Sequence, residues 1–208
     1  MNTTTVAPID FVLEALYNDA KKDRLKMAIN CLKFAFRAMQ PSDFEDSYLS
    51  ISKEQGADLV QMIIENNLKN IVEFGTSFGI STLFLAKGIS QTNGHIITTE
   101  LIASKAKTAM QNFEEAGVVD QIELRIGDAM ETLKDHKKPI DLLLLDGWKD
   151  LYLPLFQLLE PNFHEKTIIY VDNADMAESQ SFLKKVGQNA KYQFTSQYNG
   201  KVVIITIK

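Results

Sequence analysis

From residue 70 onward, short β-rich runs alternate with helical stretches, and this alternation limits the possible folds more than any other feature of the chain. It is typical of a parallel sheet whose strands are joined by crossover helices. We predict parallel strands over five runs: Ile71–Phe74, His95–Thr99, Ile122–Ile126, Ile140–Leu145 and Thr167–Tyr170. The run 140–145 is almost wholly apolar, which suits a central strand covered on both faces.

Two further β-patterned runs close the sequence, Tyr192–Gln197 and Lys201–Ile207, separated by a tight turn with Asn199 and Gly200. Such a pair predicts an antiparallel hairpin. We therefore predict a Rossmann-like, doubly wound α/β fold, with seven strands, mostly parallel apart from the C-terminal hairpin, and helices on both faces. This hairpin argues against a nicotinamide-linked oxidoreductase, because the dinucleotide-binding fold of those enzymes continues with parallel strands and does not end in an antiparallel pair.

A glycine-bearing turn follows the first predicted strand, in residues 71–79 (IVEFGTSFG). Glycine lets the backbone approach a ligand closely, ahead of the helix that begins near Ser81. The dinucleotide pattern G-x-G-x-x-G is not met, because Ser77 holds the middle position. Glu73, at the end of the strand, would repel a diphosphate but suits a ligand with an ammonium group. The alternative is a purely structural strand-to-helix turn.

Two more acids follow predicted strands. Glu100 closes the second strand, where doubly wound nucleotide folds place an acid that bonds both ribose hydroxyls. Asp128, before Ala129, follows the third strand and could accept a hydrogen bond from an exocyclic amine. The alternatives are a surface glutamate at a strand end and, for Asp128, a helix cap that could coexist with ligand binding.

A third group of polar residues follows the fourth and fifth strands: Asp146 after one, and Asp172 with Asn173 after the other. Ligands bind at the carboxyl edge of such sheets, so these three side chains can converge on one point. Two carboxylates and an amide oxygen form an incomplete shell of hard ligands that suits Mg²⁺ and leaves positions for water and substrate. For Asp146 alone, a helix cap is the alternative.

The turn at 73–79 resembles motif I of class I methyltransferases, which holds the amino acid end of S-adenosylmethionine; Glu73, Gly75 and Gly79 match it. In those proteins the loop after the third strand contacts the adenine. The resemblance implies a set of cofactor-binding positions: Glu73, Gly75, Thr76, Ser77, Gly79, Ser81, Glu100, Asp128, Ala129, Asp146 and Trp148.

Residues 145–154 (LDGWKDLYLP) are similar to the corresponding segment of the catechol O-methyltransferase family, and roughly residues 50–208 share the wider likeness. The metal ligands of that family then fall on Asp146, Asp172 and Asn173, and its general-base lysine falls on Lys149. Trp148 would lie near the cofactor and substrate pocket, or form a lid on the core. Gly147 departs from the family pattern, which has a bulkier histidine there and so a differently shaped cofactor pocket.

The resemblance implies a mechanism. Phenolic hydroxyls have a pKa near 10, and a divalent cation at two adjacent hydroxyls would stabilise the anion. Lys149, with Asp146 as the second catalytic residue, could accept the proton if a nearby cation and partial burial lower the pKa of the amine. Otherwise Lys149 is a solvated loop lysine. The expected substrate is a small hydroxylated aromatic, either catechol-like or another vicinal hydroxyl compound.

The amino-terminal part carries no motif. Residues 8–40 have the periodicity of one or two amphipathic helices, ended by Pro41, and 41–50 is predicted to be a loop. Ser52 and Gln55 form a capping box for the next helix. We predict a single domain over 1–208, in which 1–50 form a helical lid or dimerisation segment of a possible homodimer and 51–208 form the S-adenosylmethionine-binding core.

The composition argues against several classes of binding partner. The net charge of −5 with scattered lysines makes nucleic acid a poor partner, an RNA methyltransferase included. We expect no membrane association, because no apolar run reaches the ~18 residues of a membrane span. The sole cysteine, Cys31, fits helix packing and a reducing compartment, so we expect a cytoplasmic protein. The three histidines, His95, His136 and His164, lack the spacing of metal ligands.

Two alternative functions remain: an S-adenosylmethionine-binding protein without catalysis, and a methyltransferase of non-phenolic substrates.

Overall fold

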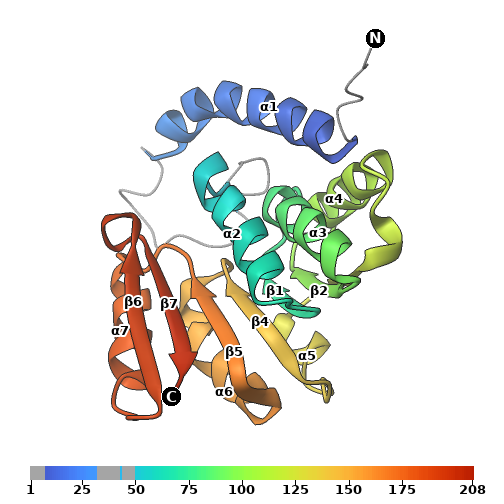
Figure 1. The fold of residues 1–208 in the computed structure, drawn as a ribbon. Coiled ribbons are helices and arrows are strands. Elements are labelled where there is room, and N and C mark those ends of the chain that lie inside the picture. Colours follow the sequence, from blue (N-terminus) through green and yellow to red (C-terminus); the bar gives the residue numbers. More distant parts are fainter. Residues whose placement is uncertain (1–7, 32–42, 44–49) are drawn as a thin grey trace.

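A seven-stranded sheet in the order β3-β2-β1-β4-β5-β7-β6 organises the computed structural model, which describes residues 8–31, 43 and 50–208, with side chains for 8–21, 43 and 50–208 (Figure 1). β1 to β5 run parallel, and β7 is antiparallel to both β5 and β6. The strands are β1 Asn70–Phe74, β2 His95–Glu100, β3 Ile122–Ile126, β4 Ile140–Leu145, β5 Phe163–Val171, β6 Tyr192–Gln197 and β7 Val202–Ile207. The predicted fold class is confirmed.

Helices cover both faces of the sheet. The described α-helices are α1 Pro8–Cys31, α2 Lys53–Glu65, α3 Ile80–Thr92, α4 Ala103–Glu115, α5 Ala129–Thr132, α6 Tyr152–Leu159 and α7 Ala177–Val186. Short 3-10 turns follow at η3 Val119–Gln121, η4 Lys149–Leu151, η5 Glu160–Asn162 and η6 Tyr198–Gly200. The helix α2 begins with the predicted capping box between Ser52 and Gln55.

The strands alternate their side chains between two cores. In β4, Leu142 and Leu144 pack with α1 to α4 on one face, whereas Leu143 and Leu145 pack with α5 to α7 on the other. All four are fully buried, which explains why a continuous apolar run is needed in this strand.

The amino-terminal helix α1 lies across the α2 and α3 side of the molecule (Figure 1). It buries Val12, Leu13 and Leu16. Ion pairs join Glu14 to Lys53 of α2 and Asp10 to Lys87 of α3. Several predictions for this region concern residues or side chains outside those that the structure describes: the apolar positions Leu25, Ile29, Cys31, Leu32, Phe36 and Met39, the helix end at Pro41 and the loop 41–49.

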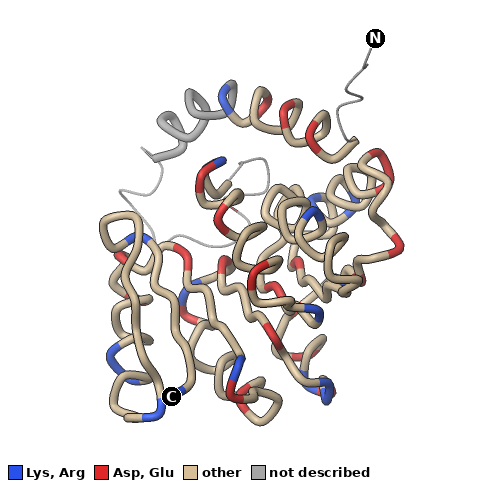
Figure 2. The backbone as a smooth tube through the Cα atoms, in the orientation of Figure 1, with Lys and Arg blue, Asp and Glu red and all other residues tan. Residues whose placement is uncertain are grey.

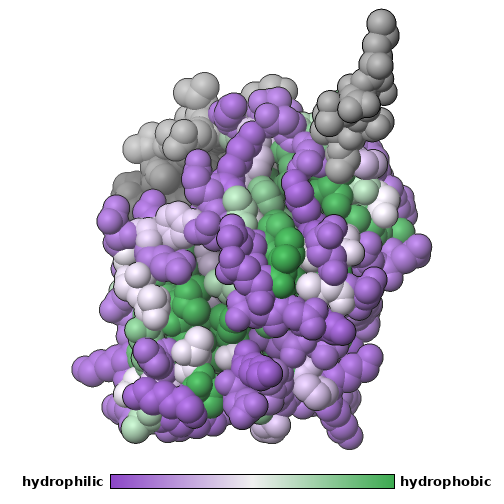
Figure 3. Space-filling model, in the orientation of Figure 1, coloured by the Kyte–Doolittle hydropathy of each residue, from purple (hydrophilic) through white to green (hydrophobic). Residues whose placement is uncertain are grey.

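Charge and hydropathy show no single dominant region on the visible face. Lys and Arg are spread among Asp and Glu over several elements (Figure 2), and apolar patches interrupt a largely hydrophilic surface (Figure 3). No helix among the described residues has both the length and the apolar character to cross a bilayer.

Candidate functional site

Asp146 and Asp172 directly follow β4 and β5, and the ends of β1, β4 and β5 lie side by side at the carboxyl edge of the sheet. The sheet order reverses between β1 and β4, and ligands of doubly wound folds bind at such a point. The N–H of Asp146 donates to the carbonyl of Phe74 at 3.0 Å, and the N–H of Asp172 donates to that of Leu145 at 3.0 Å. Adjacent strands lie about 5 Å apart, so Asp146 and Asp172 are neighbours at the carboxyl edge.

The loop after β1 packs directly on the loop after β4. Gly75 has a φ of +103°, and a β-carbon there would lie 2.7 Å from the backbone oxygen of Asp146. Gly79 has a φ of +92°, and its β-carbon would lie 2.5 Å from the ring of Phe113. Ser77 also adopts a positive φ, of 50°. The predicted glycines are thus required both by conformation and by close approach.

Glu73 lies beneath this loop and is fully buried. Its Oε2 accepts hydrogen bonds from the hydroxyls of Thr82 at 2.5 Å, Thr98 at 2.6 Å and Thr76 at 3.3 Å. Burial raises the pKa of the Glu73 carboxyl, and neighbouring hydroxyls, that of Ser81 first, oppose the rise. Oε1 has no partner among the described residues. Glu73 therefore organises the turn, and its contact with a ligand ammonium group stays a prediction.

Glu100 braces the same loop from β2. Its Oε2 accepts from the N–H of Ser77 at 2.8 Å, and its Oε1 accepts from the N–H of Ile102 at 2.9 Å. Beside it, the buried Lys105 places its Nζ 3.3 Å from Ser77 Oγ and over the ring of Phe78. A ribose hydroxyl that bonds Glu100 would therefore either share the carboxylate with the N–H groups of Ser77 and Ile102 or replace them as its hydrogen-bond donor.

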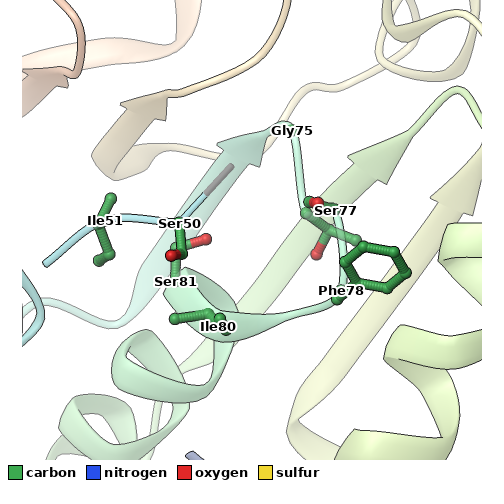
Figure 4. Close-up of a pocket in the computed structure, with 8 residues that line it drawn as sticks. Ser50, Ile51, Gly75, Ser77, Phe78, Ile80 and Ser81 are labelled. Carbon is green, nitrogen blue, oxygen red and sulfur yellow. The ribbon is translucent and has the colours of Figure 1, made fainter. Parts of the chain in front are cut away.

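A small cavity of about 10 Å³ separates residues 50–51 from the loop (Figure 4). Ser50 and Ser81 lie across it from Ser77 and Phe78, and the predicted cofactor positions Gly75 and Thr76 also line it. This volume is about the minimum that can hold a single water molecule. A nucleoside ligand would thus need the wall at 50–51 and the loop to move apart.

Asp128 caps α5, as the structural alternative predicted: its Oδ1 accepts from the N–H of Met130 at 2.8 Å. Ala129 is buried at the start of that helix. Sequence reasoning did not single out two apolar neighbours, Leu101 after β2 and Ile126 at the end of β3, which are 55% and 54% exposed. Both lie at the carboxyl edge of the sheet, next to the predicted Glu100.

Asp146 and Asp172 form a buried acidic pair. Burial raises the pKa of the Asp146 carboxyl well above its ordinary value, and the charge of Asp172 raises it further. Lys149 opposes the rise, with its Nζ 3.9 Å from Asp146 Oδ1. That ammonium also donates to the carbonyl of Gly147 at 2.9 Å, and its side chain is 16% exposed. The structure thus brings together the predicted base and two predicted metal ligands.

Asp172 has two further partners that sequence reasoning missed. Gln55 Nε2 donates to Asp172 Oδ1 at 2.8 Å, and the Tyr152 hydroxyl donates to the Asp172 carbonyl at 3.2 Å. Gln55 drew attention only as a capping residue, because a contact across 117 positions leaves no local pattern.

Asn173 directly follows Asp172 in a left-handed conformation, with φ of 50°, and is half-buried. Its carbonyl accepts from the N–H of Met176 at 3.1 Å, which fixes the turn. Whether its side-chain amide joins the two carboxylates stays a prediction. No cluster of three or more His, Cys, Asp or Glu side chains suited to a metal occurs in the described ranges. The predicted set of two carboxylates and one amide is a different kind of site, because it contains only two such side chains.

Trp148 is partly exposed beside the α5 to α7 core, with its Nε1 donating to Asp150 Oδ2 at 3.1 Å. Gly147 leaves room for Phe74, because a β-carbon at 147 would lie 2.5 Å from that ring. The departure from the family pattern at Gly147 therefore has a local cause: Phe74 fills the space that a side chain at 147 would take.

A protein-family model described as O-methyltransferase matches residues 31–203. A catechol O-methyltransferase of Niastella koreensis is 32% identical over 129 residues, covering 60% of this chain and 58% of that protein. One of Mycobacterium tuberculosis is 30% identical over 126 residues, covering 60% and 57%. The chain thus matches less than two thirds of these relatives' length.

The fold has close counterparts among solved structures. An O-methyltransferase from Bacillus cereus, solved in complex with SAH, superposes with a TM-score of 0.71 at 20% identity, and the match covers 100% of this chain and 94% of that one. This likeness supports the arrangement of strands and helices described above.

Proposed function

Because the chain belongs to the O-methyltransferase family, we propose that it transfers the methyl group of S-adenosylmethionine to one hydroxyl of a small catechol-like or other vicinal-hydroxyl compound, assisted by a divalent cation, Mg²⁺. The predicted family resemblance is confirmed by the match to residues 31–203. One observation carries the proposal: a glycine loop of the nucleotide-binding kind packs against a buried pair of carboxylates at the same sheet edge.

The donor fits the loop by chemistry. S-adenosylmethionine has an ammonium group, a sulfonium, a ribose and an adenine. Glu73 precedes the loop and Glu100 accepts from Ser77 within it, so each supplies an acid beside the loop, and Leu101 and Ile126 supply exposed apolar surface next to Glu100. We propose that the positions inferred from the resemblance hold the donor along this edge in the strand order β3, β2, β1 and β4: first Asp128 and Ala129, then Glu100, then Glu73 to Ser81, and last Asp146 with Trp148.

The cation fits the acidic pair. Asp146 and Asp172 are both largely buried, with 10% of the Asp146 side chain and 6% of Asp172 exposed. Two carboxylates at this depth repel each other and are costly unless positive charge lies nearby. Together with the Asn173 oxygen they would give the hard, incomplete ligand set that Mg²⁺ prefers. When bound, Mg²⁺ would supply positive charge that favours the ionised form of a hydroxyl.

We propose that Lys149 accepts the proton of the acceptor hydroxyl, a step for which its side chain must be the neutral amine. Its Nζ lies 3.9 Å from Asp146 Oδ1, donates to the Gly147 carbonyl and lies above the Tyr152 ring. The packing of the 75–79 loop on residues 146–147 would hold a donor methyl group next to the acceptor oxygen. Keeping the two reactants at near-attack distance is expected to supply much of the rate.

The proposal is tested in two stages. In a thermal-shift panel, S-adenosylmethionine or S-adenosylhomocysteine should raise the midpoint, whereas NAD(H) should leave it unchanged. Turnover of a panel of vicinal diphenols with labelled donor should then occur and should stop on addition of EDTA. Donor binding with no turnover of any phenol would favour the second candidates, a non-catalytic binding protein or a methyltransferase of other substrates.

We further propose that the protein is cytoplasmic and dimerises through its amino-terminal segment, 1–50, with 51–208 as the donor-binding core. Phe11 of α1 is 73% exposed and gives an apolar contact for a second copy. Light scattering coupled to size exclusion would report the mass, and a monomer at all concentrations would contradict the dimer.

A further inference from the structure

We propose that Gln55 is a positioning residue for Asp172: it holds that carboxylate in the orientation needed to bind the cation. The inference rests on the proposed function, because it concerns the same metal ligand. Gln55 lies in the first turn of α2, far from β5 in sequence, yet its Nε2 lies 2.8 Å from Asp172 Oδ1. Both residues are buried, at 9% and 6% exposure.

The orientation of the Gln55 amide is fixed by its other partner. The backbone N–H of Ser52 reaches Gln55 Oε1 at 2.8 Å. A backbone N–H can only donate, so the oxygen of the amide must face Ser52. The amide nitrogen must then face Asp172, which makes Gln55 a donor to the carboxylate and leaves no ambiguity between the two amide atoms.

Asp172 is held from three elements of the fold. Its N–H bonds to Leu145 of β4, its carbonyl accepts from Tyr152 of α6, and its Oδ1 accepts from Gln55 of α2. With the backbone fixed on both sides, the Gln55 bond fixes the position of Oδ1, while the carboxyl group also interacts with Asp146. Carboxylates that ligate metals are commonly held by a hydrogen bond of this kind, which turns the group toward the ion.

The residue type at 55 also points to this role. A capping box has Glu or Gln at this position, and either can accept from the N-cap backbone N–H. A glutamate, however, would place a second carboxylate against Asp172 in a buried environment. Glutamine is the choice that caps α2 and donates to Asp172 at once.

The test compares two variants that each damage the same capping box. Gln55→Met keeps the side-chain length but removes both hydrogen bonds. Ser52→Ala is the matched control, since it removes the bond from the Gln55 N–H to Ser52 Oγ at 3.1 Å and keeps the Gln55 to Asp172 contact. The readouts are the Kd for Mn²⁺, measured calorimetrically without donor or substrate, and the metal dependence of turnover.

We expect Gln55→Met to weaken Mn²⁺ binding by about 10- to 100-fold, as loss of a group supporting a metal ligand does, and Ser52→Ala to change it by about 2-fold at most. The metal concentration for half-maximal turnover should rise in step, with kcat recovering at saturating metal. A general loss of folding would instead lower the Mn²⁺ affinity of both variants by a similar factor. Equal Mn²⁺ affinities in the two variants, with the native protein binding normally, would overturn the role of Gln55.

Two further outcomes separate this inference from the proposed function. If the native protein binds S-adenosylmethionine but no Mn²⁺, the metal assignment fails and the role of Gln55 fails with it. If Gln55→Met does not fold, the native protein still gives an answer by NMR. The side-chain amide protons of Gln55 should exchange slowly and shift when Mg²⁺ is added, and the absence of a shift would overturn the proposal.

Discussion

Substitution of Gly75 by alanine tests whether the loop 75–79 packs directly on residues 146–147. The φ of +103° is unfavourable for any residue with a β-carbon, and this strain costs about 1–3 kcal/mol. The β-carbon would also lie 2.7 Å from the backbone oxygen of Asp146. A backbone atom cannot rotate away as a side chain can, so we add about 1–3 kcal/mol for overpacking.

The combined loss should be about 4 kcal/mol in the free energy of unfolding. For a chain of 208 residues, each kcal/mol shifts the melting temperature by roughly 2–4 °C, so Gly75→Ala should melt about 10 °C lower. Because Asp146 and the loop must separate, S-adenosylhomocysteine should no longer raise the melting temperature of this variant.

Gly117→Ala is the matched control. Gly117 also has a positive φ, of +67°, but nothing lies within 4 Å of the β-carbon that would be added. Only the strain remains, about 1–2 kcal/mol, and donor binding should be unchanged. Both quantities can be measured by urea unfolding and by thermal shift with and without S-adenosylhomocysteine. Equal losses in the two variants, or a full ligand shift in Gly75→Ala, would refute the close packing of the loops.

Three further predictions concern the chemistry and the packing of the same edge. Lys149→Met should lower kcat by about 10²-fold or more while the donor-induced thermal shift stays the same; unchanged turnover would remove Lys149 as the base. The raised pKa of Asp146 means that the folded state holds a proton that the unfolded state releases, so without metal the free energy of unfolding should fall as pH rises above about 4. Mg²⁺ competes with that proton, and melting curves should show a larger Mg²⁺ stabilisation at pH 8 than at pH 5; a larger effect at pH 5 would contradict the assignment. Gly147→Ala should destabilise by about 1–3 kcal/mol through its contact with the Phe74 ring, and Phe74→Leu in the same chain should recover part of that loss in a double-mutant cycle; additive losses would contradict the contact.

The strands could be predicted closely from the sequence because they are defined by apolar runs between turns. β3, β4 and β6 have the predicted bounds. β5 does not: it was predicted from Thr167 but begins at Phe163. The extra residues include His164, Glu165 and Lys166, which are polar, and the pairing with β4 shifts register between Ile140 and Leu142. An irregular, polar strand end has no hydrophobic pattern by which to recognise it.

The site could be predicted in part for a similar reason. Ligands gather at the carboxyl edge of parallel strands, so the acids near the ends of β1 and β2 and directly after β4 and β5 were predictable from the strand pattern. Their partners were not. The hydroxyls around Glu73, the bond between Gln55 and Asp172, and the fit of Phe74 against Gly147 each depend on tertiary packing between segments. Sequence spacing carries no information about such contacts.

The acidic pair also shows why stability and function are expected to be linked at this edge. Besides burial, Asp172 and Glu73 both raise the pKa of Asp146, whereas Lys149 lowers it. In a buried setting, one ammonium at 3.9 Å does not balance three carboxyls, and the folded protein compensates by favouring a proton on Asp146. A divalent cation would replace that proton, and a sulfonium donor would add further positive charge nearby. In the proposed reaction the donor sulfur would become neutral once the methyl group is transferred, so the acids that favour binding of the sulfonium form would hold the neutral product less strongly.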